Sequence, residues 1–359
     1  MTASAATTAP PSAPAIVQPA PREVSFGLVA GTVAPGTRRI VVRVDGHVVA
    51  DRRLRGTRFS LHVDLPPRDV AVRVTAVRRG ETRSSLVRPV FGLPRASEPR
   101  RRLGHADGAL QRRVTTLGRS YSGTAGVYVQ NLTTGAGAAW NAQARFPAAS
   151  TLKLAIALAV LRASPTTPEP GSWLDARLRA MLGSSDNDAA NELEHWLGGS
   201  YRVDETIRAL GLTNTIMYGG YESERRPQGA VPIPIRTEEQ PSFPIGKYTT
   251  AWDLARLLRE VWLAAGTRSS FPGVVTAPDA RYLLFLLAHV RDRGKLDRYL
   301  AGRAVVLHKA GWISSARHDN GLVFWRGGVF VAAVLTWRGG GADELAGRVA
   351  RTAYDRFSG

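Results

Sequence analysis

Three short groups of polar residues in this chain have the types and spacing that serine-based acyl transfer requires. In the first group, Ser150 and Lys153 open the apolar stretch FPAASTLKLAIALAVL at residues 146–161. Positions i and i+3 share one face of a helix, so the two side chains are expected about one turn apart. A lysine desolvated against an apolar helix tends to lose its charge, and its neutral amine can then take the proton of a serine hydroxyl. Alone, the pair is also explained by a helix-capping serine and a lysine that reaches along the surface to water.

The other two groups follow later in the chain. Ser185-Asp186-Asn187 offers a second hydroxyl that can relay a proton and an amide that can hold a substrate carbonyl. The same three residues are also typical of a helix start. Lys309-Ala310-Gly311 ends a β-branched strand, where the lysine can steer a carboxylate and the glycine allows a ligand to approach the backbone closely.

Together and in this order, the three groups resemble the Ser-x-x-Lys, Ser-Asp-Asn and Lys-Thr-Gly motifs of the class A β-lactamases and penicillin-binding proteins. The flanking segments RFPAASTLKL, SDNDAAN and HKAGW…RHDNGLVFW are similar to those of the family, and the resemblance covers about residues 104–359. It implies a β-lactamase/transpeptidase-like α+β domain, an antiparallel sheet flanked by helices with a reduced all-helical subdomain. It also implies an acyl-enzyme mechanism without a metal or other cofactor.

The resemblance assigns a role to each matching residue. Ser150 is the acylated nucleophile, Lys153 is a candidate base for acylation, and Ser185 passes a proton to the leaving nitrogen. The oxyanion hole is expected from the backbone N–H groups of Ser150 and Trp312. The other implied positions are Asn187 for the substrate amide, Lys309 for the substrate carboxylate, Gly311 beside it, Arg317 as a second carboxylate-binding cation, and Asn191 as support for the active-site loop.

The chain departs from the family pattern in three respects. Ala310 replaces the threonine of the third motif, and the short distance from Ser150 to Ser185 predicts a smaller helical subdomain with a more open site. The segment LGLTNTIMYGGYESERRPQG has no Glu-x-x-Leu-Asn, which in class A enzymes supplies the base that activates the deacylating water. Glu222 is the best candidate for that base. An equally good interpretation is that Glu222 is a solvated loop carboxylate without a catalytic role. About thirty residues without regular structure follow, and loops of this length are usually functional or disordered.

The apolar periodicity predicts the elements that position these groups. A hairpin with a turn near Thr134-Gly135 is expected before the apolar helix, and three strands cluster late in the chain. Helices are expected near 107–119, 154–161, 172–183, 186–197, 202–210, 250–265, 279–290 and 343–354. Strands at both ends of this region therefore flank a helical middle and share one sheet.

The length of 359 residues predicts two domains. Short alternating strands and an Asp45-Gly46 turn indicate an all-β, Ig-like sandwich of five or six strands that serves as a binding or spacer module. The expected boundaries are a disordered tail at 1–23, the all-β domain at 24–93, a linker at 94–105 and the hydrolase domain at 106–359.

The net charge of +19 indicates an anionic binding partner. The arginines are scattered and no helix-turn-helix or aromatic RNA-binding pattern accompanies them, so an anionic cell-envelope surface is favoured over nucleic acid. The absence of cysteine excludes disulfides and thiolate chemistry. No run reaches the ~18 apolar residues of a membrane span. The N-terminal segment lacks the basic and apolar regions of a signal peptide, whereas the resemblance implies a secreted or envelope protein.

Three functions remain open. The first is a β-lactamase that hydrolyses the β-lactam amide and so gives antibiotic resistance, which the SDNDAAN extension favours. The second is a D-Ala-D-Ala peptidase of the penicillin-binding type acting on peptidoglycan stem peptides, which the missing Glu-x-x-Leu-Asn favours. The third is a non-catalytic cell-wall-binding protein, against which the full set of serine, lysine and asparagine positions argues.

Overall fold

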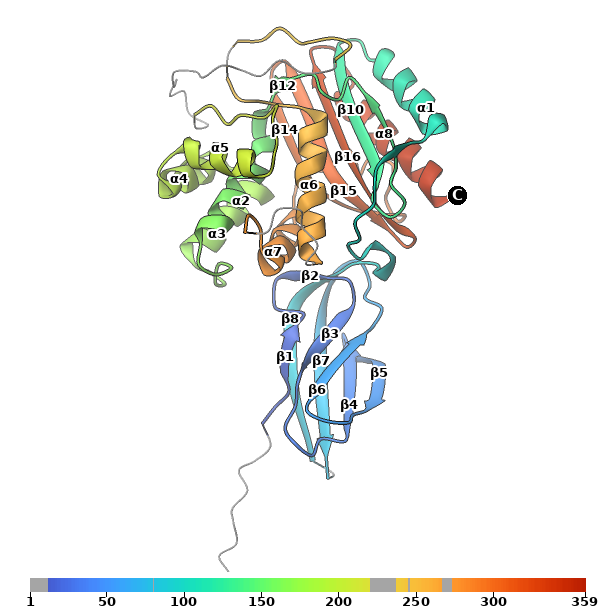
Figure 1. Ribbon diagram of the computed structural model, residues 1–359, viewed down its shortest axis with the longest axis vertical. Helices are drawn as coiled ribbons and strands as arrows, with labels where there is room; N and C mark the ends of the chain where they lie inside the picture. The colour runs from blue at the N-terminus through green and yellow to red at the C-terminus, as the bar shows by residue number, and fades with distance from the viewer. Residues whose placement is uncertain (1–11, 80, 220–236, 245, 267–272) are drawn as a thin grey trace, which may run out of the picture. The chain divides into compact units, whose positions relative to one another are not determined.

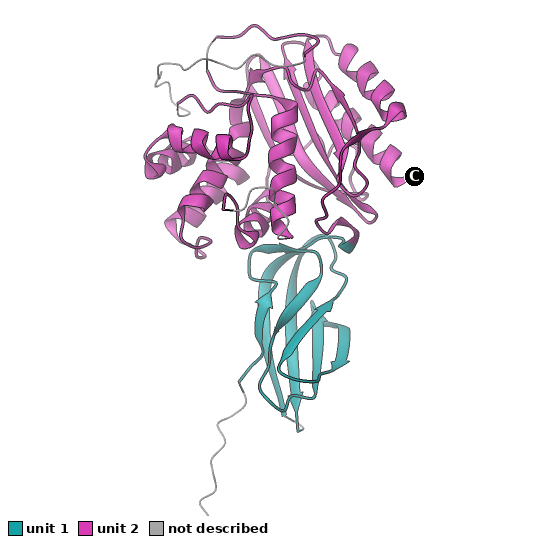
Figure 2. Cartoon of the chain, viewed as in Figure 1, with its two compact units in different colours: residues 1–95 teal, residues 96–359 magenta. Residues whose placement is uncertain are grey.

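A computed structural model describes residues 12–79, 81–219, 237–244, 246–266 and 273–359 (Figure 1). The chain divides into two compact units, residues 1–95 and 96–359 (Figure 2). Each unit has a hydrophobic core of its own.

The first unit is a sandwich of two β-sheets. Its strands are β1 (Ala15–Gln18), β2 (Glu23–Ser25), β3 (Leu28–Thr32), β4 (Arg39–Val44), β5 (His47–Arg53), β6 (Arg58–His62), β7 (Asp69–Arg78) and β8 (Glu81–Gly92). One sheet has the order β1-β3-β6 and the other the order β2-β8-β7-β4-β5. Alternate residues of the strands fill one core, since side chains one apart in a strand point to opposite faces. Asp45 and Gly46 both have positive φ in the β4–β5 hairpin, as the sequence predicts.

The sandwich begins earlier in the chain than the sequence predicts. Strand β1 lies within residues 1–23, the segment expected as a disordered tail, and the unit contains eight strands in its described residues instead of five or six. Strand β1 is only four residues long and flanked by prolines, so its pairing with β3 leaves little periodic signal in the sequence.

The second unit is built on a six-stranded sheet. Its strands are β9 (His105–Ala106), β10 (Thr124–Asn131), β11 (Ala136–Trp140), β14 (Val305–Ile313), β15 (Ala316–Trp325) and β16 (Gly328–Trp337), with a separate pair β12 (Phe146–Pro147) and β13 (Tyr248–Thr249). The order β14-β15-β16-β10-β11-β9 joins the two ends of the unit in one sheet and places β14 at an edge. All pairs are antiparallel except β11–β9, which is parallel. The predicted α+β fold is confirmed.

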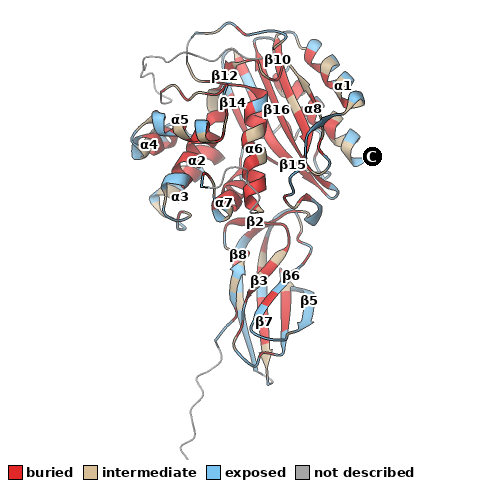
Figure 3. Cartoon of the chain, in the orientation of Figure 1, coloured by how far each residue is buried: buried red, intermediate tan, exposed pale blue. Residues whose placement is uncertain are grey.

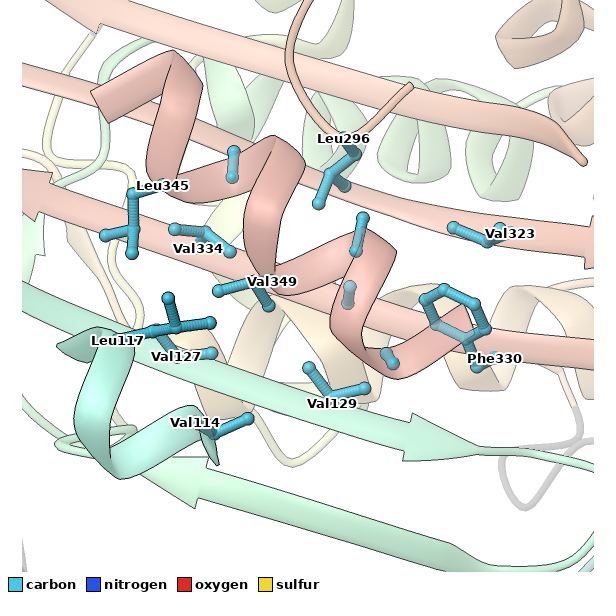
Figure 4. Close-up of a cluster of buried hydrophobic side chains, with 14 of the residues drawn as sticks. Val114, Leu117, Val127, Val129, Leu296, Val323, Phe330, Val334, Leu345 and Val349 are labelled. Atoms are coloured by element: carbon cyan, nitrogen blue, oxygen red, sulfur yellow. The ribbon is translucent and has the colours of Figure 1, made fainter. Parts of the chain in front are cut away.

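The helices form layers on both faces of this sheet. They are α1 (Gly108–Arg119), α2 (Lys153–Ala163), α3 (Trp173–Gly183), α4 (Asn187–Leu197), α5 (Ser200–Ala209), α6 (Ala251–Ala265), α7 (Ala277–Ala288) and α8 (Ala342–Ser358), with 3-10 turns η1 (Arg95–Ser97) and η2 (Ala149–Leu152). Helices α1 and α8 cover one face, where Val114 and Val349 meet Val127 and Val334 of the strands (Figure 4). Helix α6 covers the other face, with Trp252 edge-on to Tyr128 at 4.9 Å between ring centroids.

Helix α2 is the most deeply buried helix segment near the sequence motifs. Every residue from Lys153 to Leu161 is buried (Figure 3). A helix that is apolar all round requires neighbours on every side, and α2 packs against α3, α4, α5 and α7. No helix in the described part of the chain combines the length and the hydropathy needed to cross a membrane.

Candidate active site

Ser150 lies in the 3-10 turn η2, directly before helix α2. The sequence placed Ser150 and Lys153 on one helix, and the structure corrects this: only Lys153 belongs to α2. The turn is tightened by two contacts to the Ala148 carbonyl, from Thr151 N at 3.2 Å and from Thr151 Oγ1 at 2.6 Å. Ala149 has φ +47°, a left-handed conformation that costs energy for a residue other than glycine. The backbone is therefore held in an uncommon conformation just before Ser150.

The strand that leads into Ser150 is fastened on two sides. His318 of β15 donates from Nε2 to the Pro147 carbonyl at 2.6 Å and accepts at Nδ1 from Thr336 N at 3.2 Å. Burial lowers the pKa of His318 to about 4, so the ring is neutral and these two bonds require the hydrogen on Nε2. On the other side, Ala148 N donates to the Lys247 carbonyl at 3.0 Å.

Lys153 is fully buried at 0% exposure. Its Nζ donates to the Ser185 carbonyl at 2.5 Å and to Asn187 Oδ1 at 2.6 Å. Burial lowers the pKa of Lys153 to about 8, against the opposing charges of Asp186 and Glu194. The structure therefore contradicts the alternative of a lysine that reaches along the surface to water. With this pKa a minor but substantial fraction of the amine is neutral at physiological pH.

The Ser-Asp-Asn group is both a helix start and part of the site. Asp186 caps α4 by accepting from Ala189 N at 2.9 Å, and Asn187 is the first residue of that helix. Ser185 has φ +60°, and its Oγ accepts from Lys309 Nζ at 2.9 Å. The two interpretations of this group therefore hold together, because the cap fixes the backbone that presents Ser185 and Asn187.

Lys309 stands on edge strand β14, with 1% exposure. Its Nζ also donates to the Ala310 carbonyl at 2.7 Å. Burial first, and then the charge of Lys153, lower the pKa of Lys309 to about 7. The two sequence-predicted lysines thus lie close enough for the charge of Lys153 to disfavour that of Lys309.

Gly311 brings strand β14 against the turn that carries Ser150. A Cβ at Gly311 would stand 2.7 Å from Ser150 N, 2.8 Å from Thr151 N and 3.2 Å from the Ala149 Cβ. Only glycine therefore permits this approach. The next residue, Trp312, is 66% exposed.

These segments enclose one cleft of about 410 Å³. Its walls come from the turn around Ser150, the start of α4 at Asn187, the end of β14 at Trp312, and the segment before β13. The full lining is Pro147, Ala149, Ser150, Asn187, Phe243, Pro244, Gly246, Lys247, Trp312, Ile313, Ser315 and Trp337. No sequence motif includes the lining residues Phe243, Pro244, Gly246 and Lys247. The one sequence signal for this wall is that Lys247 is one of only four lysines in the chain.

The remaining predicted residues are placed as follows. Arg317 forms an ion pair with Asp343 of α8 at 3.2 Å between Nη1 and Oδ2, and it does not line the cleft. Asn191 is half-buried on α4, one helical turn after Asn187. Glu222 lies outside the described residues. Within the described ranges, no cluster of three or more histidine, aspartate or glutamate side chains is arranged to hold a metal ion.

Comparison with known proteins identifies the family. The model of the Beta-lactamase enzyme family matches residues 109–166 and 172–357, and the chain belongs to that family. No curated protein matches the chain.

Several solved structures share the fold. PBP-A is 23% identical, with a TM-score of 0.58, over 72% of this chain and 99% of that one. A PBP-A mutant in an acyl-enzyme complex with penicillin G is 24% identical, with a TM-score of 0.57, over the same shares. The beta-lactamase from Streptosporangium roseum is 20% identical, with a TM-score of 0.56, over 70% of this chain and 99% of that one. At these identities the likeness concerns the fold.

Proposed function

We propose that the chain is a serine hydrolase whose Ser150 is acylated by opening the amide of a β-lactam ring and is then freed by water. The observation that carries this proposal is the connected set of polar contacts around Lys153. Its Nζ bonds the Ser185 carbonyl and the Asn187 side chain, and Ser185 Oγ in turn accepts from Lys309. A set of this kind would link a base, a proton relay and a carboxylate-binding cation beside the cleft that Ser150 and Asn187 line.

Acylation begins with proton removal from Ser150. With a pKa of about 8, about one Lys153 in ten is neutral at pH 7. A base whose pKa lies near the working pH is efficient, because it is available and still accepts a proton readily. Neutral Lys153 takes the Ser150 proton as Oγ attacks the lactam carbonyl carbon.

Collapse of the tetrahedral intermediate breaks the ring C–N bond. The negative charge on the carbonyl oxygen would be stabilised by the backbone N–H groups of Ser150 and Trp312, a role supported by the close packing of Gly311, the residue before Trp312, against the turn of Ser150. Ser185 donates its hydroxyl proton to the leaving nitrogen, and Lys309 stabilises the developing alkoxide through its bond to Ser185 Oγ. The proton that Lys153 took from Ser150 then restores the Ser185 hydroxyl and leaves Lys153 neutral. Lys309 also attracts the carboxylate of the substrate.

The second candidate function is a peptidase of the penicillin-binding type, in which the acyl group leaves slowly. The sequence observation in its favour is the absence of Glu-x-x-Leu-Asn after α5. A mutant of PBP-A, which shares the fold of this chain, has a solved structure as an acyl-enzyme complex with penicillin G. Glu222 stays the candidate for a deacylation base.

The test uses a chromogenic cephalosporin, with turnover and intact mass followed together. Steady turnover supports a β-lactamase, and a persistent adduct without turnover supports the peptidase-like reading. A protein that gives neither is a non-catalytic member of the fold. Ser150→Ala should form no adduct, whereas Ser184→Ala, which removes an exposed hydroxyl bonded to the Ala180 carbonyl, should react as the wild type does. An adduct on the Ser150→Ala protein would remove Ser150 as the nucleophile.

The proposal includes a location at the cell envelope. Residues 1–95 hold 15 arginines against 6 acidic residues, a charge excess that favours an anionic surface. The division of the chain at residue 95 supports an all-β domain that ends there and is followed by the hydrolase domain. Fractionation of cells that express the full chain tests this location, and recovery of the protein only from the cytoplasm would contradict it.

A further inference from the structure

We propose that the outward face of the five-stranded sheet in the first unit binds the anionic surface of a lipid bilayer, with Arg43 and Arg73 contacting lipid phosphates. This inference goes beyond the acyl chemistry proposed for Ser150, and it gives the proposed envelope location a contact surface. All the residues that carry it belong to the first unit, so it does not depend on the cleft.

The alternation of strands β4 and β7 directs both arginines away from the core. The residues on either side of Arg43 and of Arg73 all fill the core of the sandwich, namely Val42, Val44, Val72 and Val74. Because successive side chains of a strand point to opposite faces, the two arginines lie on the outward face of the sheet. Arg73 is exposed and Arg43 is half-buried.

The two arginines face each other across neighbouring strands. Arg43 lies directly opposite Arg73 in the antiparallel pair β4–β7. Side chains that are opposite in such a pair share one face and are in close reach, and like charges there destabilise the sheet. Arg39 of β4 lies opposite Arg53 of β5 in the same way. The fold gains nothing from these like-charged pairs, whereas an anionic ligand would remove the repulsion.

The acidic residues near this face bind other partners or lie at its end. Asp51 accepts from Arg39 Nε at 2.6 Å, and Asp45 pairs with Arg68 at 2.7 Å between Oδ2 and Nη1. Asp69 begins β7, about 13 Å along the strand from the opposed arginines. Within the described residues, neither of the two opposed arginines forms an ion pair.

Exposed aliphatic side chains flank the opposed arginines. Strands β5, β4, β7 and β8 are successive neighbours in one sheet (Figure 1). Val48 of β5 lies opposite Arg43 and is 55% exposed. Leu86 of β8 lies opposite Arg73 and is 41% exposed. We call these four residues the arginine row, which crosses three strand spacings or about 14 Å.

The composition of the arginine row fits a bilayer surface. At a membrane interface, aliphatic side chains enter the boundary of the acyl chains while cationic side chains are attracted to anionic headgroups. A site for a single-stranded nucleic acid combines a cationic groove with aromatic rings on which bases stack. Neither the arginine row nor its outward neighbours Val41, Thr75 and Ser84 include an aromatic residue.

The test is co-sedimentation of the full chain with vesicles. Vesicles of phosphatidylcholine alone are compared with vesicles that contain equal parts of phosphatidylcholine and phosphatidylglycerol, at an ionic strength of about 0.1 M. The partition coefficient should be high only for the vesicles with phosphatidylglycerol. It should fall steeply when the ionic strength is raised to about 1 M, because the screening length then shortens from about 10 Å to about 3 Å.

The double substitution Arg43→Gln/Arg73→Gln should lower the partition coefficient about thirtyfold, since each arginine at an anionic membrane contributes about fivefold. Its urea-unfolding midpoint should not fall, because a like-charged pair is removed. Arg58→Glu is the matched control and changes the net charge by the same amount. Arg58 is an exposed residue of β6 in the other sheet and points to the opposite side of the sandwich, so this variant should lose less than threefold.

An equal partition coefficient for the wild type and the double variant would overturn the inference, and so would an equal loss in Arg58→Glu. Binding of the wild type to soluble polyphosphate, without binding to the anionic vesicles, would also overturn it and assign the face to a linear polyanion. The double variant should acylate Ser150 at the wild-type rate with the chromogenic cephalosporin. Failure of vesicle binding therefore leaves the proposed hydrolase function standing, and failure of acylation leaves the membrane surface standing.

Discussion

Replacing Gly311 by alanine should damage the reaction far more than the fold. The added Cβ would lie 2.7 Å from Ser150 N and 2.8 Å from Thr151 N. Ordinary contact begins near 3.4 Å, so strand β14 and the turn must separate by about 0.7 Å. Both neighbouring atoms belong to the backbone, and no side-chain rotation can relieve the overlap. A shift approaching 1 Å in a reacting geometry costs about a hundredfold in rate, and here it would move the two proposed oxyanion donors apart.

The assay is the acylation rate constant with a chromogenic cephalosporin, together with the unfolding midpoint in urea. Gly311→Ala should lose about a hundredfold in the rate, with a free energy of unfolding lower by about 1–3 kcal/mol, as for overpacking. Gly108→Ala is the matched control, since the nearest atom to its added Cβ is the end of the Arg112 side chain at 3.8 Å. A Gly311→Ala enzyme that acylates within threefold of the wild type would refute the role given to this close approach.

Two further outcomes are expected. The acylation rate constant should depend on pH as a bell-shaped curve with a maximum between about 7 and 8, because Lys153 must be neutral and Lys309 charged. Burial lowers the pKa of Lys153 to about 8 and that of Lys309 to about 7, and the two limbs of the curve report the two lysines as an interacting pair. A rate still rising at pH 9.5 would show that Lys309 does not need its charge. Asp319→Asn should lower the free energy of unfolding by about 3 kcal/mol near pH 6, since Asp319 accepts from His308 Nδ1 at 2.9 Å inside the core. Although burial opposes it, Asp319 raises the pKa of His308. This stabilisation is therefore present below about pH 6.5 and is lost as pH rises through the raised pKa, so the effect measured by urea unfolding should shrink at pH 9. An equal loss at both pH values would contradict the ion pair.

The sequence predicted most of the second unit because its signals are local. The apolar periodicity of α6 and the β-branched runs of β14–β16 each depend on a few neighbouring residues. The predicted range of α6 agrees with the structure to within one residue, and the three expected late strands are present. The candidate residues Ser150, Ser185 and Lys309 came instead from the order of three short groups that resembles a family's motifs, and their roles stay a prediction.

What the sequence did not predict depends on contacts between distant segments. The 3-10 turn at Ser150 exists because β12 is fastened to His318 and Lys247, which are far along the chain. Strand β9 has two residues and gains its structure only by parallel pairing with β11. Arg317 was expected at the substrate, but Asp343 of α8 lies within ion-pair distance, and no local pattern indicates that neighbour.

The distribution of lysine makes the cleft chemically distinct from the rest of the protein. The chain holds 48 lysine and arginine residues but only four lysines. Lys247 lines the cleft, Lys153 is bonded to the cleft-lining Asn187, and Lys309 is bonded to Ser185, two residues before Asn187. An arginine side chain stays protonated in water and cannot supply a neutral nitrogen. Lys153, with a pKa of about 8, is about one-quarter neutral at pH 7.5, whereas about one in a thousand ordinary lysines is neutral at that pH. Amine-selective acylating reagents should therefore react at this cleft in preference to the arginine-rich surface. The same property offers a route to covalent ligands that attach through nitrogen and leave the serine untouched.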